Sequence, residues 1–228
     1  MKLLSIIIPV YNEKKTIEEI ICRIDNVEVG MQKEIIIVDG CSTDGTTEIL
    51  NNLDRKDIKV IIEEKRRGKG AAIIRGFKEA SGDIILIQDA DLEVHPSEYP
   101  YLLRPILEGN TAVVFGSRFI KGRGLTPVGS YVGNKLITWA VNIFFRVHLT
   151  DIATCHKVFT KEVIKNLNVK SNGFEIEAEI TTRLIKNRIR IHEIPIDYVP
   201  RTREEGKKLH WRIGFKVMLA ILKFRLTK

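Results

Sequence analysis

Asp89 and Asp91 stand two residues apart, shortly after an apolar run at residues 84–87. Side chains two residues apart on an extended chain point to the same side, so the two carboxylates can share one cation. Carboxylate oxygens that leave positions open for water and substrate phosphates suit Mg²⁺ or Mn²⁺. The alternative is that Asp91 caps the following helix while Asp89 is solvated. The pair predicts a divalent metal site at a strand end.

Polar segments also follow two other apolar runs. Residues 3–8 lead into PVYNE at residues 9–13, and residues 35–38 lead into DGCSTDGT at residues 39–46. Each segment taken alone is equally well explained as a turn or a helix cap. Chance alone does not readily place three such segments at one sheet edge, so together they indicate a functional site.

Two glycine-containing segments resemble phosphate-binding motifs only in part. Gly40 and Gly45 have the spacing of a P-loop, but Thr46 and Thr47 occupy the positions that require Lys and Ser or Thr. This difference excludes a Walker-type nucleotidase. The segment GKGAA at residues 68–72 is too short for a dinucleotide fingerprint, which disfavours a dehydrogenase.

Apolar runs alternate with helical patterns through the first 115 residues, which predicts an α/β fold. The predicted strands are residues 3–8, 35–38, 58–62, 84–87 and 112–115. The predicted helices are residues 17–24, with Thr16 and Glu19 as a capping box, 46–53, 70–81, closed by Gly82, and 97–107. This alternation indicates a mostly parallel sheet flanked by helices, with ligands at the carboxyl ends of the strands.

The alternation ends near residue 120. The remaining patterns predict a glycine-rich loop at 121–133, an apolar helix at 136–145, an amphipathic helix at 173–186 and a strand at 189–198. The 228 residues fit one large domain with an appendage. We therefore expect a catalytic domain at 1–200, followed by a basic loop and an amphipathic C-terminal helix at 201–228.

Charge is concentrated at the C-terminal end. The formal net charge is +8, and residues 201–228 hold nine basic residues against two acidic ones, which leaves the rest of the chain nearly neutral. This distribution predicts an anionic partner for the C-terminal segment. The three cysteines, Cys22, Cys41 and Cys155, form no zinc or disulfide pattern, so we expect a cytoplasmic location.

The motifs taken together resemble a known enzyme family. IPVYNE at 8–13, VDGCSTDGT at 38–46, RGKG at 67–70, DADLE at 89–93 and GSR at 116–118 resemble family 2 glycosyltransferases with the GT-A fold, in order and in spacing. TDIATCHK at 150–157, GFEIE at 173–177 and EIPIDYVPR at 193–201 with KKL at 207–209 look like the branch that makes dolichyl- or polyprenyl-phosphate hexoses, such as mannose.

The resemblance implies a role for each matching residue. The implied nucleoside and diphosphate site comprises Pro9, Tyr11, Glu13, Val38, Asp39, Lys69, Asp89 and Ala90. The implied metal ligands are Asp89, Asp91 and Glu93, the last at a position where some relatives have Gln. The implied catalytic residues are Asp91, Arg118, Arg201 and Lys208, where Arg201 and Lys208 act on the leaving diphosphate and Lys207 can share that role. Asp151 would orient the acceptor or Lys157.

The implied chemistry is self-consistent. A divalent metal and fixed Arg or Lys donors stabilise the charge that develops on a leaving diphosphate. A phosphomonoester acceptor, with a second pKa of about 6, is anionic at pH 7 and needs no strong general base. His156 is the one histidine inside these motifs, and Glu175 and Glu177 are either acidic site residues or first-turn residues of a helix.

The C-terminal helix pattern indicates a membrane surface. Arg212, Lys216 and Lys223 fall on one side of a helix that is otherwise mostly apolar, which is typical of an interfacial helix on anionic lipid. The alternative is a helix docked on the sheet, from whose edge the Lys and Arg side chains reach solvent. The helix at 136–145, with Trp139, is a second interfacial candidate.

These observations predict a transferase on the cytoplasmic face of a membrane, associated peripherally. It would move mannose or glucose from a nucleoside-diphosphate sugar to a polyprenyl phosphate, with inversion and with Mg²⁺ or Mn²⁺. The same fold with a soluble or glycan acceptor is the first alternative. Nucleic-acid binding by the basic tail is a remote one, because the tail lacks interleaved aromatic and basic residues. GDP and UDP donors both remain open, as does a separate membrane subunit.

Overall fold

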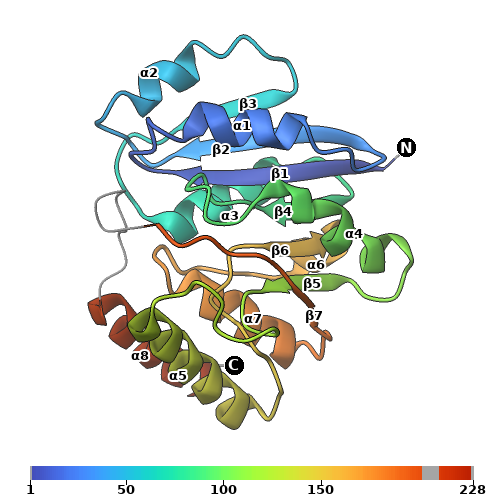
Figure 1. Ribbon diagram of the computed structural model, residues 1–228, viewed down its shortest axis with the longest axis vertical. Helices are drawn as coiled ribbons and strands as arrows, with labels where there is room; N and C mark the ends of the chain where they lie inside the picture. The colour runs from blue at the N-terminus through green and yellow to red at the C-terminus, as the bar shows by residue number, and fades with distance from the viewer. Residues whose placement is uncertain (1, 202–210, 227–228) are drawn as a thin grey trace.

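The computed structural model describes residues 2–201 and 211–226, and its centre is a seven-stranded sheet (Figure 1). The strand order is β3-β2-β1-β4-β6-β5-β7. The strands are β1 (Leu3–Val10), β2 (Gln32–Asp39), β3 (Ile58–Ile62), β4 (Ile84–Ile87), β5 (Val113–Ser117), β6 (Lys157–Thr160) and β7 (His192–Pro195).

Strand direction decides which residues meet at the edge of this sheet. The pairs β1–β2, β1–β4, β2–β3 and β5–β7 are parallel, whereas β6 is antiparallel to both β4 and β5. Because β6 reverses direction, β5 runs the same way as β4. The carboxyl ends of β1, β2, β4 and β5 therefore lie at one edge, together with the first residue of β6, Lys157.

Helices cover both faces of the sheet, as in other α/β folds. The helices are α1 (Ile17–Asp25), α2 (Thr46–Asn51), α3 (Lys69–Glu79), η1 (Pro96–Glu98), α4 (Tyr99–Leu107), α5 (Val128–Phe145), α6 (Lys161–Asn166), α7 (Ile176–Lys186) and α8 (Trp211–Leu226). One core cluster joins α1 and α4 to the sheet, and another joins α3, α6 and α7 to the opposite face. Val114 belongs to the first cluster and Val113 and Phe115 to the second, as side-chain alternation along a strand dictates.

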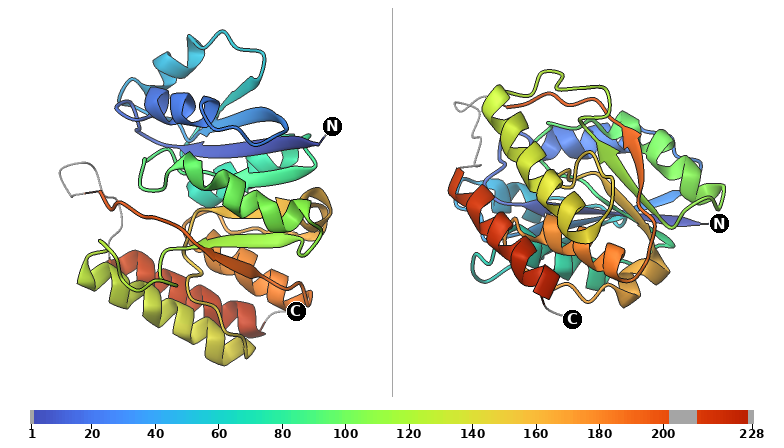
Figure 2. Two further views of the ribbon diagram at one scale, coloured as in Figure 1. Left: turned by 45° about the vertical axis from the view of Figure 1, so that its right-hand side comes forward. Right: turned by 90° about the horizontal axis from the view of Figure 1, so that it is seen from below.

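The predicted α/β class and the C-terminal helix are confirmed. That helix, α8, packs on α5 and α7 rather than on the sheet, with Val217 and Ile221 buried against Val141 and Ala178. Figure 2 shows α5 and α8 side by side at one end of the molecule. Within the described residues, no helix is both long enough and apolar enough to cross a bilayer.

Several local predictions were wrong, each for an identifiable reason. The predicted loop at 121–133 ends at Pro127, because α5 begins at Val128 and includes Gly129 and Gly133. The antiparallel strand β6 was missed, because it has four residues and begins with a lysine. The predicted strand at 189–198 is shorter, since β7 spans four residues.

The two predicted helix caps were also wrong. Thr16 makes no side-chain cap and instead donates its hydroxyl hydrogen to Glu13, so the capping box with Glu19 is absent. Helix α3 ends at Glu79 with the extended residue Ala80 as its cap, and Gly82 plays no part. A Cβ at position 82 would lie 2.5 Å from Oγ of Ser5, so that glycine permits close packing rather than a helix end.

Glycines in two helices are expected to respond oppositely to alanine. A Cβ at Gly76 of α3 would lie 2.4 Å from Cγ2 of Ile7 in the core, and overpacking of this kind typically costs about 1–3 kcal/mol. A Cβ at Gly133 of α5 would have no neighbour within 4 Å. We expect Gly76→Ala to lower the free energy of unfolding and Gly133→Ala to raise it by up to about 1 kcal/mol, as urea denaturation would measure. Equal stability of the two variants would contradict this packing.

Candidate active site

The carboxyl end of β2 organises its own turn. The carboxylate of Asp39 is fully buried and accepts hydrogen bonds from Ser42 N at 3.1 Å, from Ser42 Oγ and from Thr47 Oγ1. The neighbouring side chain of Val38 is also fully buried. Asp39 thus fixes the 39–47 turn, and its hydrogen bond to a nucleotide base stays a prediction.

The end of β1 lies directly beside that turn. Val10 pairs in register with Asp39, as Pro9 does with Val38, so residues 9–13 adjoin the 39–47 turn. The guanidinium carbon of Arg66 lies 4.0 Å from the centroid of the Tyr11 ring. The structure therefore brings the predicted nucleoside-pocket residues of β1 and β2 together.

The DADLE segment after β4 is held by Tyr198 and Arg201, which lie 105 to 110 residues later in the chain. Tyr198 donates its hydroxyl hydrogen to Glu93 Oε2 at 2.9 Å, and the backbone N–H of Arg201 donates to Glu93 Oε1 at 2.9 Å. Arg201 also donates from Nε to the Asp91 carbonyl and from Nη2 to Glu13 Oε2 at 2.7 Å. Glu93 therefore fastens residues 198–201 over the site, and its predicted part in a metal shell stays a prediction.

The electrostatics of Asp91 favour a bound cation. Burial, and then the neighbouring charges of Asp89 and Glu93, raise the pKa of Asp91 to about 7, while Arg201 opposes that rise. A divalent cation would relieve this repulsion, so the residues fit Mg²⁺ or Mn²⁺. Among the described residues, no group of three or more His, Cys, Asp or Glu is arranged to hold a metal. Water and substrate oxygens would then complete the coordination shell of a cation held by Asp89 and Asp91.

Metal binding is expected to release a proton near neutral pH. Because Asp91 must ionise to bind a cation, we expect affinity for Mn²⁺ to rise as the pH passes from about 6 to about 8. Calorimetry in buffers of different ionisation enthalpy would count the released protons. Asp91→Asn serves as the control and should release none. The same affinity at both ends of this pH range would contradict the assignment.

A chain of alternating charges runs from Asp89 into the protein. Lys69 Nζ lies 2.8 Å from Asp89 Oδ2 and 3.1 Å from Glu177 Oε1. The other oxygen of Glu177 pairs with Lys157, whose side chain is fully buried. Glu177 is therefore more than a first-turn carboxylate of α7. Nearby charges of Asp89 and Glu177 raise the pKa of Lys69 against the effect of burial.

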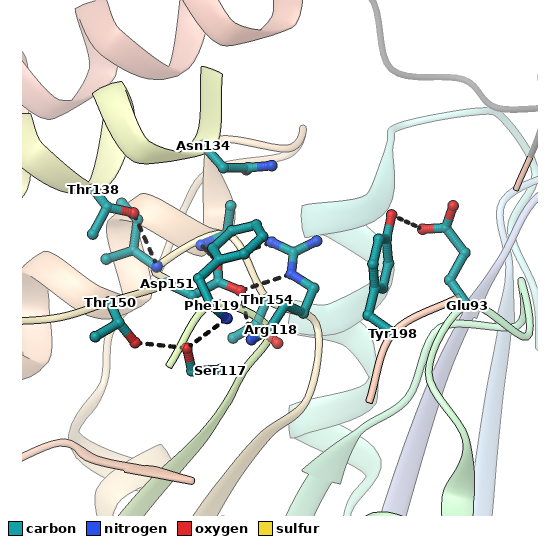
Figure 3. A network of polar contacts seen from close by, with 12 residues as sticks. Glu93, Ser117, Arg118, Phe119, Asn134, Thr138, Thr150, Asp151, Thr154 and Tyr198 are labelled. Atoms are coloured by element: carbon teal, nitrogen blue, oxygen red, sulfur yellow. Dashed lines mark hydrogen bonds and ion pairs between the residues drawn. The ribbon is translucent and has the colours of Figure 1, made fainter. Parts of the chain in front are cut away.

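Arg118 and Asp151 form a second charged pair at the same edge. Arg118 donates from Nε to Asp151 Oδ2 at 2.7 Å and from Nη2 to Oδ1 at 2.9 Å, and Asp151 is fully buried (Figure 3). The Glu193 carboxylate accepts from the backbone N–H groups of Thr150 and Asp151, which fixes the loop that carries the aspartate. The bidentate pair sets the plane of the guanidinium.

Tyr198 links this pair to the DADLE segment. The Arg118 guanidinium carbon lies 5.1 Å from the centroid of the Tyr198 ring, and Figure 3 shows that ring between Arg118 and Glu93. The structure thus brings Asp89, Asp91, Lys69, Arg118 and Arg201 to one edge. Lys207 and Lys208, two predicted diphosphate contacts, lie outside the described residues.

Sequence reasoning missed a neutral network beneath the aspartates. Gln88 donates from Nε2 to the carbonyls of Asp89 and Val94, and its Oε1 accepts from the hydroxyl of Tyr99. His156 Nε2 lies 2.7 Å from the same oxygen. Burial lowers the pKa of His156 to about 3, so the neutral ring donates to Gln88. These residues fix the backbone of the 88–94 segment. His156 lies inside one of the family motifs, but nothing in the sequence links it to Gln88 or Tyr99.

An apolar groove lies on α5, beside the loop that carries Asp151. Its volume is about 460 Å³, and it is lined by Tyr131, Val132, Lys135, Leu136, Thr138, Trp139, Asn142 and Leu149. Trp139 is 62% exposed, and Phe215 on the neighbouring helix α8 is also 62% exposed. The two helices together present large apolar side chains to solvent.

Sequence comparison identifies relatives of known activity. A model of glycosyl transferase family 2 matches residues 5–167. The chain is 37% identical to a dolichol-phosphate mannosyltransferase of Pyrococcus furiosus, over 89% of this chain and 58% of that protein. It is 30% identical to the low-salt glycan biosynthesis hexosyltransferase Agl6 of Haloferax volcanii, over 88% of this chain and 49% of that protein. The chain thus spans about half the length of these two curated relatives.

Structural comparison supports the fold. Glucosyl-3-phosphoglycerate synthase of Mycobacterium tuberculosis, solved with Mn²⁺, UDP and phosphoglyceric acid, superposes with a TM-score of 0.76 and 21% identity. The match covers 100% of this chain and 80% of that one. The sheet with its flanking helices is therefore the GT-A arrangement that the motifs predict.

Proposed function

The chain belongs to glycosyltransferase family 2, and we propose that it transfers a hexose from a nucleoside-diphosphate sugar to a polyprenyl phosphate at a membrane surface. The donor hexose would be mannose or glucose, the reaction would invert the sugar carbon, and Mg²⁺ or Mn²⁺ would be the cofactor. The observation that carries this proposal is the convergence of the acidic pair Asp89 and Asp91 with the cations of Lys69, Arg118 and Arg201 at one sheet edge.

The donor side of the reaction needs charge control. Asp89 and Asp91 would hold the cation, which when bound neutralises charge on the leaving diphosphate. Arg201 lies beside them, because its Nε bonds the Asp91 carbonyl and its Nη2 bonds Glu13. A guanidinium held in this way is oriented before the leaving group departs, so it loses little freedom during the reaction.

The acceptor side needs orientation rather than a base. A phosphomonoester has a second pKa of about 6 and is already nucleophilic at pH 7. His156 cannot serve as a base for it, since the ring is fully buried and bound to Gln88. Arg118 has five N–H donors, and Asp151 accepts two of them, so the guanidinium retains donors for an anionic oxygen. We assign Arg118 to the acceptor phosphate.

The surface of α5 and α8 supports a lipid-borne acceptor. Trp139, Ile143, Phe215 and Leu219 are each at least half exposed on these helices. Lys216 and Lys223 are exposed on α8 beside that apolar face. Exposed aromatic and aliphatic side chains bordered by lysines suit the headgroup region of an anionic membrane.

The decisive experiment offers the protein both kinds of acceptor. Radiolabelled GDP-mannose and UDP-glucose would be supplied with Mn²⁺ and either polyprenyl phosphate in vesicles or a water-soluble phosphorylated acceptor. Product should form on the polyprenyl phosphate with at least one donor. Product on the soluble acceptor alone would establish the alternative, and hydrolysis without transfer to either acceptor would contradict the proposal.

Membrane binding depends in this proposal on the exposed face of α5 and α8. Trp139→Glu combined with Phe215→Glu should lower partition onto anionic vesicles by more than about tenfold, since burying one such side chain contributes on the order of 1.5–3 kcal/mol. Tyr101→Glu is a matched control, because Tyr101 is 64% exposed but lies on α4. Vesicle sedimentation is the measurement. An equal loss of binding in the control variant would contradict a specific membrane face.

A further inference from the structure

The ammonium group of Lys69 lies between the carboxylate of Asp89, a proposed metal ligand, and that of Glu177, to which the proposed mechanism gives no role. Its Nζ donates a hydrogen bond to Asp89 Oδ2 at 2.8 Å. Oε1 of Glu177 is 3.1 Å away, yet this buried oxygen accepts no hydrogen bond from any described residue. Lys69 therefore has a second acceptor within reach, close enough for a small movement of Nζ to complete the bond.

Glu177 is itself fixed from behind. Its Oε2 pairs with Lys157, which is fully buried at the start of β6 and also donates to the carbonyls of Ile152 and Thr154. The Lys157 ammonium lies 4.8 Å from the centroid of the Phe115 ring. Glu177 cannot follow Lys69 if that residue moves, so Oε1 stays where it is.

A cation at Asp89 changes the balance between the two acceptors. A divalent ion bound to the Asp89 carboxylate repels the Lys69 ammonium. It also competes with Lys69 for Asp89 Oδ2, which accepts the hydrogen bond from Lys69 in the metal-free protein. Glu177 Oε1 gains from the same event, because it already lies in an ion pair with Lys69 but accepts no hydrogen bond from a described residue, and a buried carboxylate oxygen without a hydrogen bond is costly. The favoured response is a transfer of the lysine hydrogen bond from Asp89 to Glu177.

We propose that Lys69 occupies the place of the metal at Asp89 in the metal-free protein and shifts its hydrogen bond to Glu177 when a divalent cation binds. Glu177 is then a positioning residue for the metal site, held by Lys157. The inference rests on the proposed function only in requiring a divalent cation at Asp89 and Asp91.

The proposal predicts that loss of Lys69 and loss of Glu177 have opposite effects on the affinity for Mn²⁺. Lys69→Met removes the competing cation and should raise the affinity for Mn²⁺. Removing the acceptor at position 177 should lower that affinity, because Lys69 then stays on Asp89. Glu177→Leu alone would leave Lys157 as a buried unpaired charge, so the variant to use is Lys157→Met/Glu177→Leu. That pair keeps the net charge and the approximate volume, and it is expected to fold.

Mn²⁺ binding to metal-free protein without nucleotide, measured by electron paramagnetic resonance, tests these effects. We expect affinity to rise about tenfold in Lys69→Met and to fall about tenfold in Lys157→Met/Glu177→Leu, the size typical of residues coupled in one network. In the triple variant with Lys69→Met, the fall caused by the pair should shrink to less than about twofold.

Glu179→Gln supplies the control on the same helix. Glu179 is buried and bonds Arg183 and the backbone of Lys170 and Ser171, and among the described residues its ion pair is with Arg183 and not with Lys69, so the loss of its charge should leave Mn²⁺ affinity unchanged. Two results would overturn this inference and leave the proposed function intact. One is that Lys157→Met/Glu177→Leu lowers Mn²⁺ affinity equally with and without Lys69, and the other is that Lys69→Met lowers Mn²⁺ affinity. Failure of the unmodified protein to bind Mn²⁺ would overturn both this inference and the proposed metal cofactor.

Discussion

Asp91→Asn is expected to lower the turnover number for sugar transfer by at least about 1,000-fold, the upper range for removal of one electrostatic stabiliser. The substitution keeps the shape of the side chain and removes one of the two charges proposed to hold the cation. Initial rates at saturating donor and Mn²⁺ would measure it. Glu93→Gln is the comparison, because it keeps an oxygen for Tyr198, and we expect a loss below about tenfold there.

Asp91→Asn should also be more stable than the unmodified protein in the absence of metal. The pKa of Asp91 is raised to about 7, so its ionisation favours unfolding, and the unmodified protein loses stability as the pH rises from the unfolded pKa towards and through 7. The asparagine variant escapes that loss. Thermal denaturation in EDTA at pH 8 should give the variant the higher melting temperature. In the structure, His95 and not Asp91 caps the following helix, so full activity of Asp91→Asn would mean that Asp91 only holds the turn in which its Oδ1 accepts from the backbone N–H of Glu93.

Arg118→Met is expected to lower turnover by about 100-fold or more, since it removes a fixed guanidinium from the proposed acceptor site. It also leaves Asp151 buried without its partner, and breaking a buried ion pair typically costs about 3–5 kcal/mol. Activity and the free energy of unfolding must therefore be measured together.

The double variant Arg118→Met/Asp151→Leu separates the two effects. Replacing a buried ion pair by apolar groups is often neutral for stability, so the double variant should recover most of the lost free energy of unfolding. Its turnover should stay low. Recovery of turnover along with stability would show that Arg118 only maintains the fold.

The first half of the fold could be predicted because it follows simple periodicity. The strands β1, β2 and β4 contain runs of consecutive buried apolar residues, as buried parallel strands do, and the edge strand β3 is apolar apart from Lys59. The helices α1 and α3 show helical spacing. The polar ends of β1, β2 and β4 follow from the direction of parallel strands. The site residues on those three ends were therefore accessible to sequence reasoning.

The rest of the site depends on long-range contacts that leave no local pattern. Lys157 is a fully buried charged residue at the start of β6, and its charge is compensated by Glu177, which lies 20 residues later. Gln88 and His156 meet across 68 residues through one hydrogen bond. Arg201 reaches Glu13 over 188 residues, and the motif resemblance, not spacing, indicated its importance.

The antiparallel strand β6 has a consequence for the order in which the protein folds. It is the hydrogen-bonded connection between β4 and β5, so without it the sheet divides into β3-β2-β1-β4 and β5-β7. During synthesis, residues 1–156 can pair β1 to β4 but cannot join β5 to them. The joining of β5 to β4 waits until residue 160 has left the ribosome, and β7 is added later still. Until β6 is made, the edge of β4 is unpaired in the nascent chain, and an unpaired strand edge is prone to pair with other chains.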